Sequence, residues 1–252
     1  AAAGIAFGEL FSTFYSVRGL QKSRSDIFRP GFSFSSIRLR FRELVPLSLP
    51  LTANRVLLGL LQGIEAVSIP GCLKLYNHST SEALSTYGVL TGMALPCILF
   101  PSAITNSVSI MLMPTVAELQ VKDQASGIRK LLQKVLGSCF LMGLFCCLFF
   151  LFFGQLIGQF LFASDLAGNF IITLAWICPF LYVNGSLLSV LNGFGKTTTS
   201  FTINMVGLAI RIGSVFFAIP VFGIQGYLWG LLISQLAVSI CCSVVLKHLI
   251  SA

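Results

Sequence analysis

The apolar stretch at residues 44–70 constrains this chain most, because it is long enough to cross a bilayer and still carries strongly polar side chains. About 20 apolar residues span the hydrocarbon core as a helix. The polar residues lie three or four positions apart, so a helix places them on one face. Lipid does not solvate such a stripe, which must face other protein or a water-filled cavity. The stripe consists of Thr52, Arg55, Gly59, Gln62 and Glu65.

The composition extends this interpretation to the whole chain. Of the 252 residues, 56% are hydrophobic and 10% are charged, whereas a typical soluble domain has about 25% charged residues. We therefore predict an all-α, polytopic membrane protein, in which the end of one transmembrane helix precedes a six-helix transmembrane lobe. The predicted spans of this lobe are residues 44–70, 84–113, 135–162, 168–191, 200–219 and 227–246.

The positions of lysine and arginine predict the domain organisation and the orientation. Residues 18–43 form a basic linker between the helix end at 1–17 and the lobe at 44–252. Cytoplasmic loops carry an excess of Lys and Arg, so we expect this linker on the cytoplasmic side. If the spans alternate in direction, the basic connection at 114–134 and the C-terminus also lie on the cytoplasmic side. Lys74 is then the only Lys or Arg on the outer side. The expected location is the cell membrane.

Several function classes are not favoured by the residues. The net charge is +8, but nucleic-acid binding needs a water-facing basic patch. The cations here flank apolar spans, which is typical of topology signals and of contact with membrane lipids. The eight cysteines show no metal-ligand spacing, and Val190 stands where a phosphate-binding loop ending at Lys196 needs glycine. We expect no nucleic acid, no metal or other cofactor, and no enzymatic activity, because no catalytic set of side chains is present.

Two patterns within the spans predict how the helices pack. Pro96 and Pro101 interrupt the span at 84–113. They predict either a broken helix, of the kind that lines a substrate path, or a simple kink. Gly59 and Gly63 predict the close approach of another helix to the first span.

The span at 200–219 carries a second polar stripe with its own arginine. A charge at the centre of a spanning helix costs about 3 kcal/mol on insertion scales, so both intramembrane arginines need partners. In one interpretation, Arg55 and Arg211 line a shared cavity and bind an anionic substrate such as a diphosphate, because guanidinium groups donate paired hydrogen bonds to phosphate. The second stripe consists of Asn204, Gly207, Arg211 and Ser214.

Two further roles for the arginines stay open. They pair structurally with Glu65, Glu9 or backbone carbonyl groups, or Arg55 extends its side chain to the membrane interface. Arg55 and Glu65 do not pair directly, because ten residues of helix separate them by about 15 Å. The candidate substrate-binding residues are Arg55, Arg211, Gln62, Glu65 and Asn204.

Residues 79–119 resemble a signature of the polysaccharide-biosynthesis flippases. The order of its motifs is typical of the stage V sporulation protein B-like branch, whose relatives include the MurJ lipid II flippases. The motifs are Tyr87-Gly88, Gly92-Met93-Ala94, the paired prolines, Leu112-Met113-Pro114 and the following Ala117-Glu118. The segment 191–197, LNGFGKT, is similar to an inner turn of that family. Glu65 departs from the aspartate that these proteins often carry. The resemblance covers the chain from about residue 40 onward.

The resemblance implies the multidrug/oligosaccharidyl-lipid/polysaccharide exporter fold, in which two six-helix lobes enclose a cavity that opens alternately to each side. It implies a flippase for a lipid-linked saccharide or a peptidoglycan precursor. This chain would be most of the second lobe plus the end of the sixth helix. Its partners would be the missing N-terminal lobe of the same protein, membrane lipids and the lipid-linked anionic saccharide. The alternatives are a multidrug exporter-like transporter and a truncated membrane scaffold that transports nothing.

Overall fold

The computed structural model describes residues 8, 11–15, 18, 56–76, 79–122 and 125–251. The chain divides into two units, Ala1–Leu49 and Pro50–Ala252. Of the first unit, residues 11–15 are helical, and the guanidinium of Arg18 lies 5.3 Å from the centre of the Phe14 ring. The predicted roles of Glu9, Thr52, Arg55 and the linker beyond Arg18 lie outside the described residues.

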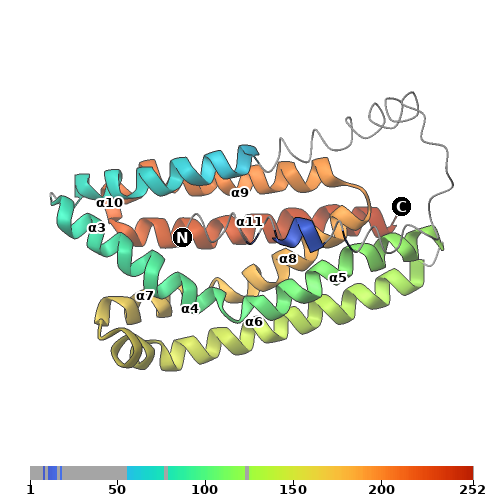
Figure 1. Ribbon diagram of the computed structural model, residues 1–252, viewed down its shortest axis with the longest axis horizontal. Helices are drawn as coiled ribbons and strands as arrows, with labels where there is room; N and C mark the ends of the chain where they lie inside the picture. Colours follow the sequence, from blue (N-terminus) through green and yellow to red (C-terminus); the bar gives the residue numbers. More distant parts are fainter. Residues whose placement is uncertain are drawn as a thin grey trace. The chain divides into compact units, whose positions relative to one another are not determined.

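The second unit is helical throughout its described part, which confirms the predicted all-α class (Figure 1). In the part of the chain that the structure describes, five helices are long and apolar enough to cross a membrane, and a sixth span results if the bent pair α7 and α8 is counted as one. The two members of that pair meet at 54°. The elements are the helix Val56–Tyr76, α3 (Thr80–Val89), the π-helix η1 (Leu90–Ala94), α4 (Leu95–Leu99), α5 (Ser102–Val121), α6 (Ala125–Phe162), α7 (Asp165–Ala175), α8 (Cys178–Gly193), α9 (Thr197–Phe217), α10 (Ile219–Phe222) and α11 (Ile224–Ser251).

The span predicted at 84–113 is interrupted, as its two prolines indicated. α4 ends at Leu99, and α5 starts at Ser102 after a turn that contains Pro101. Proline has no N–H group and cannot continue the helical hydrogen-bond ladder. Side chains bind carbonyl groups beside this break: the Ser102 hydroxyl donates to the carbonyl of Leu99 at 2.6 Å, and the Tyr182 hydroxyl donates to that of Ile98 at 2.8 Å. The break is therefore tied to α8.

The connection predicted at 114–134 is mostly helical and not a loop. α5 continues to Val121, and α6 begins at Ala125 and runs for 38 residues. A helix satisfies its own backbone groups, so it continues past the hydrocarbon core while its charged side chains remain in water. Lys122 and Glu118 form an exposed ion pair at 2.6 Å near the end of α5.

Small residues bring the helices together, but not at the predicted pair. A Cβ added at Gly143 of α6 would lie 2.6 Å from Cα of Pro179 on α8, and one at Gly207 of α9 would lie 2.6 Å from the Val238 side chain on α11. Both glycines therefore permit close helix packing. A Cβ at Gly59 or Gly63 would meet nothing within 4 Å. The predicted close approach there is wrong for the described part of the chain, where both glycines lie on the exposed face of their helix.

A buried polar belt lies between two apolar clusters of the second unit. On α8, Asn184 lies between Tyr182, which belongs to the first cluster, and Leu187, which belongs to the second. On α11, Ser234 lies between members of the same two clusters. Hydrogen bonds satisfy most of the belt, as buried polar groups require. Its buried members are Glu65, Ser102, Thr105, Ser109, Asn184, Ser186 and Ser234.

Candidate functional site

A buried ion pair joins the helix Val56–Tyr76 to α9, which lie side by side in Figure 1. The Nε of Arg211 donates to Oε1 of Glu65 at 2.9 Å, and its Nη2 donates to Oε2 at 2.6 Å. The hydroxyl of Tyr227 on α11 donates to the same Oε1 at 2.7 Å. Three helices therefore meet at one carboxylate, whose side chain is only 3% exposed.

The sequence of the first helix explains why Glu65 faces inward. Val56, Leu60, Ile64 and Val67 are exposed and form the face available to lipid. Glu65 lies on the opposite face, one turn before the buried Ile69. Desolvating a carboxylate is costly unless it is paired and hydrogen-bonded. The fork of Arg211 and the Tyr227 hydroxyl provide that compensation.

A cavity of about 310 Å³ borders this ion pair. Its walls carry five carboxamide side chains, each from a different helix, together with the guanidinium of Arg211. Apolar side chains such as Leu58 and Val238 fill the spaces between them. A carboxamide both donates and accepts hydrogen bonds, so the cavity presents both kinds of group from several directions. The five carboxamides belong to Gln62, Asn106, Asn184, Asn204 and Gln235.

One acceptor in the wall of this cavity has no hydrogen-bond partner among the described residues. Asn184 donates from Nδ2 to the backbone carbonyl of Gln235 at 3.0 Å and to its Oε1 at 2.7 Å. Its Oδ1 is buried and unpaired. An unpaired buried oxygen costs about 1–3 kcal/mol, and its presence in a native structure calls for a specific reason. The two hydrogen bonds from Nδ2 to Gln235 hold the carboxamide in this orientation.

The sequence-predicted residues are distributed around this site as follows. Gln62, Asn204 and Arg211 line the cavity together, and Glu65 touches it through Arg211. Arg211 pairs with Glu65, as one of the interpretations expects, and it also lines the cavity. Arg55 lies outside the described residues.

Sequence reasoning missed four polar residues of the site. Each of them is a polar side chain within a mostly apolar span, which is itself a signal of an inward-facing position in a membrane helix. No group of three or more His, Cys, Asp or Glu side chains that could hold a metal occurs among the described residues. The missed residues are Asn106, Asn184, Tyr227 and Gln235.

The fold and the site define a multi-pass helical membrane protein with a buried polar cavity. The chain is similar to stage V sporulation protein B of Bacillus subtilis (strain 168), with 26% identity over 223 residues, which cover 87% of this chain and 43% of that protein. It is also similar to sporulation protein YkvU of the same organism, with 26% identity over 93 residues, or 37% of this chain and 21% of that protein. The first likeness confirms the resemblance to the stage V sporulation protein B-like family.

The chain spans less than half the length of these curated relatives. No family model matches it. No solved structure matches it either.

Proposed function

We propose that this chain is one lobe of a membrane transporter, a flippase that moves a lipid-linked saccharide or peptidoglycan precursor across the cell membrane. The observation that carries the proposal is the cavity with five carboxamides, which lies within a bundle of helices that are apolar enough to span a membrane. Polar groups are costly inside a membrane and mark substrate pathways there. The likeness to stage V sporulation protein B supports the same family of functions.

The chemistry of the cavity favours the saccharide part of such a ligand. A sugar hydroxyl donates one hydrogen bond and accepts others, and carboxamides match both capacities. Asn184 Oδ1 is an acceptor without a partner in the described part of the chain. This oxygen has almost no accessible surface, so a sugar hydroxyl would pair with it, and remove the cost of leaving it unpaired, once the Asn184 side chain turns toward the cavity.

Of the roles that the sequence leaves open for Arg211, the proposal keeps the pairing with Glu65 and gives up the binding of a diphosphate. Glu65 balances its positive charge, so the pair attracts a diphosphate only weakly. Among the described residues only its Nε and Nη2 atoms have acceptors, and Nη1 keeps its donors for a ligand that enters the cavity. Arg211 therefore supplies directed hydrogen bonds and little net charge. We assign attraction of the diphosphate to other cations, with Arg55 as the candidate in this chain.

Transport by alternating access requires a second wall facing this cavity. In our proposal the N-terminal lobe of the same protein supplies that wall, and its relative motion opens the cavity to each side in turn. The cytoplasmic position of the linker at 18–43 and of the C-terminus belongs to the same proposal, since it rests on the excess of Lys and Arg on that side.

The proposal is tested with the full-length protein in vesicles and a fluorescent polyprenyl-diphosphate-linked saccharide. Asn204→Leu and Gln62→Leu remove polar groups from the cavity without touching the ion pair, and we expect each to slow flipping about tenfold. Thr202→Leu is the matched control, because Thr202 is exposed on α9 and bonds only to the carbonyl of Thr198 in the described structure. Normal flipping by correctly inserted cavity variants contradicts the proposal.

The same vesicles separate the alternatives. A multidrug exporter-like protein would bind an organic cation, which requires an acidic group that is free to attract it. Both oxygens of Glu65 are already occupied by hydrogen-bond donors, so we expect no competition between an organic cation and the saccharide lipid. A protein that binds neither ligand and flips neither would be a scaffold.

A further inference from the structure

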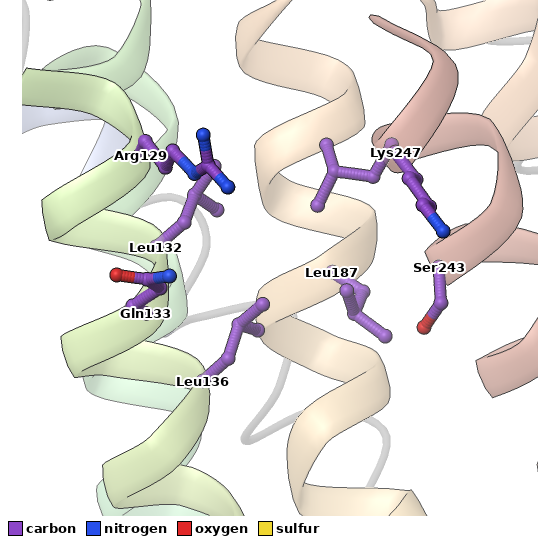
Figure 2. Close-up of a pocket in the computed structure, with 8 residues that line it drawn as sticks. Arg129, Leu132, Gln133, Leu136, Leu187, Ser243 and Lys247 are labelled. Atoms are coloured by element: carbon purple, nitrogen blue, oxygen red, sulfur yellow. The ribbon is translucent and has the colours of Figure 1, made fainter. Parts of the chain in front are cut away.

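A second cavity, of about 390 Å³, lies between α6, α8 and α11, away from the polar belt. Figure 2 shows Arg129 on α6 and Lys247 on α11, on opposite sides of α8. Leu132, Leu136 and Leu187 line the space between them. None of these residues belongs to the candidate saccharide site.

The rim of this cavity is cationic, and none of the described residues that line it is acidic. Arg129 and Lys247 are both exposed, and no acidic residue lines the cavity. Neither cation forms an ion pair with any residue in the part of the chain that the structure describes. Gln133 and Ser243 add neutral hydrogen-bond donors beside them. The rim therefore attracts an anion with several oxygen acceptors, such as a phosphate group.

The floor of the cavity is apolar and belongs to the core of the bundle. Four leucines form it, and three of them are almost completely buried in the second apolar cluster. A free inorganic anion would gain nothing from such a floor, whereas an acyl chain would cover it. The four are Leu132, Leu136, Leu187 and Leu246.

The position of the rim along the helices matches the membrane surface. α6 has 38 residues, or about 57 Å of helix, and exceeds the hydrocarbon core, which is about 30 Å thick. Arg129 lies in the second turn of α6, and Lys247 lies in the last turns of α11, so both lie near the ends of their helices. Leu132 and Leu136 lie deeper than Arg129 along α6, Leu187 lies on α8 between the two, and Leu246 is next to Lys247 on α11. A phospholipid arranges its phosphate and its acyl chains in this same order.

We propose that this cavity binds an anionic phospholipid of the adjoining leaflet, with its phosphate between Arg129 and Lys247 and an acyl chain over the four leucines. Basic pockets between transmembrane helices on the cytoplasmic side bind anionic headgroups in this way. The proposal does not depend on transport of a saccharide lipid, because the two cavities share no lining residue. A bound lipid would bridge α6 and α11 across α8.

The test measures binding of phosphatidylglycerol and phosphatidylcholine to the purified full-length protein by native mass spectrometry. We expect tighter binding of phosphatidylglycerol. Arg129→Gln and Lys247→Gln should each weaken that binding about fivefold, and the double variant should weaken it about thirtyfold. Because both side chains are exposed, the variants should keep their fold, which circular dichroism checks.

The matched control is the double variant Lys130→Gln and Lys134→Gln. It removes two exposed cations from the same end of α6, but neither residue lines the cavity. A change of less than about twofold in this variant supports a site, and an equal loss in both double variants shows general surface attraction and overturns the proposal. Equal binding of the two lipids also overturns it. Displacement of the lipid by inorganic pyrophosphate would show a site for soluble anions and would overturn it as well.

Discussion

Arg211 binds Glu65 through two parallel hydrogen bonds, of 2.9 Å from Nε and 2.6 Å from Nη2, across a sequence separation of 146 residues. The pair connects the first described helix of the lobe to α9, and Tyr227 adds α11 to the same carboxylate. A largely buried, bidentate ion pair of this kind fixes the arrangement of the helices more than it adds to net stability. We expect these three helices to move as one body during any transport cycle.

Removing one partner of this pair should destabilise the protein strongly. Glu65→Gln or Arg211→Gln leaves an uncompensated buried charge, at a cost of about 3–5 kcal/mol. The double variant removes both charges, so its loss of stability should be much smaller than the sum of the single losses. Thermal unfolding of the purified protein in detergent measures all three. Additive losses would show that the two side chains do not interact.

The Tyr227 hydroxyl should contribute more to the stability of the fold than the buried hydroxyl of Tyr182. Tyr227→Phe deletes a donor to an ionised acceptor and should cost about 1.5–3 kcal/mol. Tyr182→Phe deletes a donor to the neutral carbonyl of Ile98 and should cost about 0.5–1.5 kcal/mol. Both changes remove a single oxygen from a buried ring, so unfolding measurements on the two variants compare the acceptors directly. A reversed order would argue against an ionised Glu65.

The glycines should divide into two groups when alanine replaces them. Gly143→Ala brings a methyl group 2.6 Å from the backbone of Pro179, which has little freedom to move, and should cost about 1–3 kcal/mol. Gly63→Ala meets open space and should stabilise its helix by up to about 1 kcal/mol. Thermal unfolding compares the pair. Strong destabilisation by Gly63→Ala would indicate that another segment packs on that face.

The predicted orientation is open to a labelling test in intact cells. Lys74→Cys should react with a membrane-impermeant maleimide added outside, and Lys196→Cys should react only after lysis, because positive residues favour the cytoplasmic side. Cys97 and Cys241, which are only partly buried, are first replaced by alanine, and the other native cysteines are buried. The opposite pattern of labelling would invert the topology and move the proposed phospholipid site to the outer leaflet.

Much of the helical framework was predictable from the sequence. An apolar stretch long enough to cross a bilayer predicts a spanning helix even when its neighbouring helices are not known, because the backbone groups of a helix bond to one another. Pro101 likewise marked the break before α5, since the missing N–H group is a local property. Helix ends were less predictable. The connection at 114–134 became helical because its charged residues are compatible with a helix that extends into water.

The residues of the site were predictable only in part. Gln62, Glu65, Asn204 and Arg211 stood out because lipid excludes such groups from a spanning helix. That rule says only that they face inward.

The sequence alone determined that this chain spans a membrane as helices and that its intramembrane polar groups must be enclosed, because those demands arise within each helix and its solvent. Which polar group meets which was decided by tertiary structure alone. Glu65 neutralises Arg211, and Asn184 bonds to Gln235 and keeps one oxygen without a partner among the described residues. These contacts join residues on different helices, so they depend on how each helix is rotated and how deep it lies. Close packing at glycines such as Gly143 and Gly207 helps to set that rotation and depth. The sequence of one span does not contain this information.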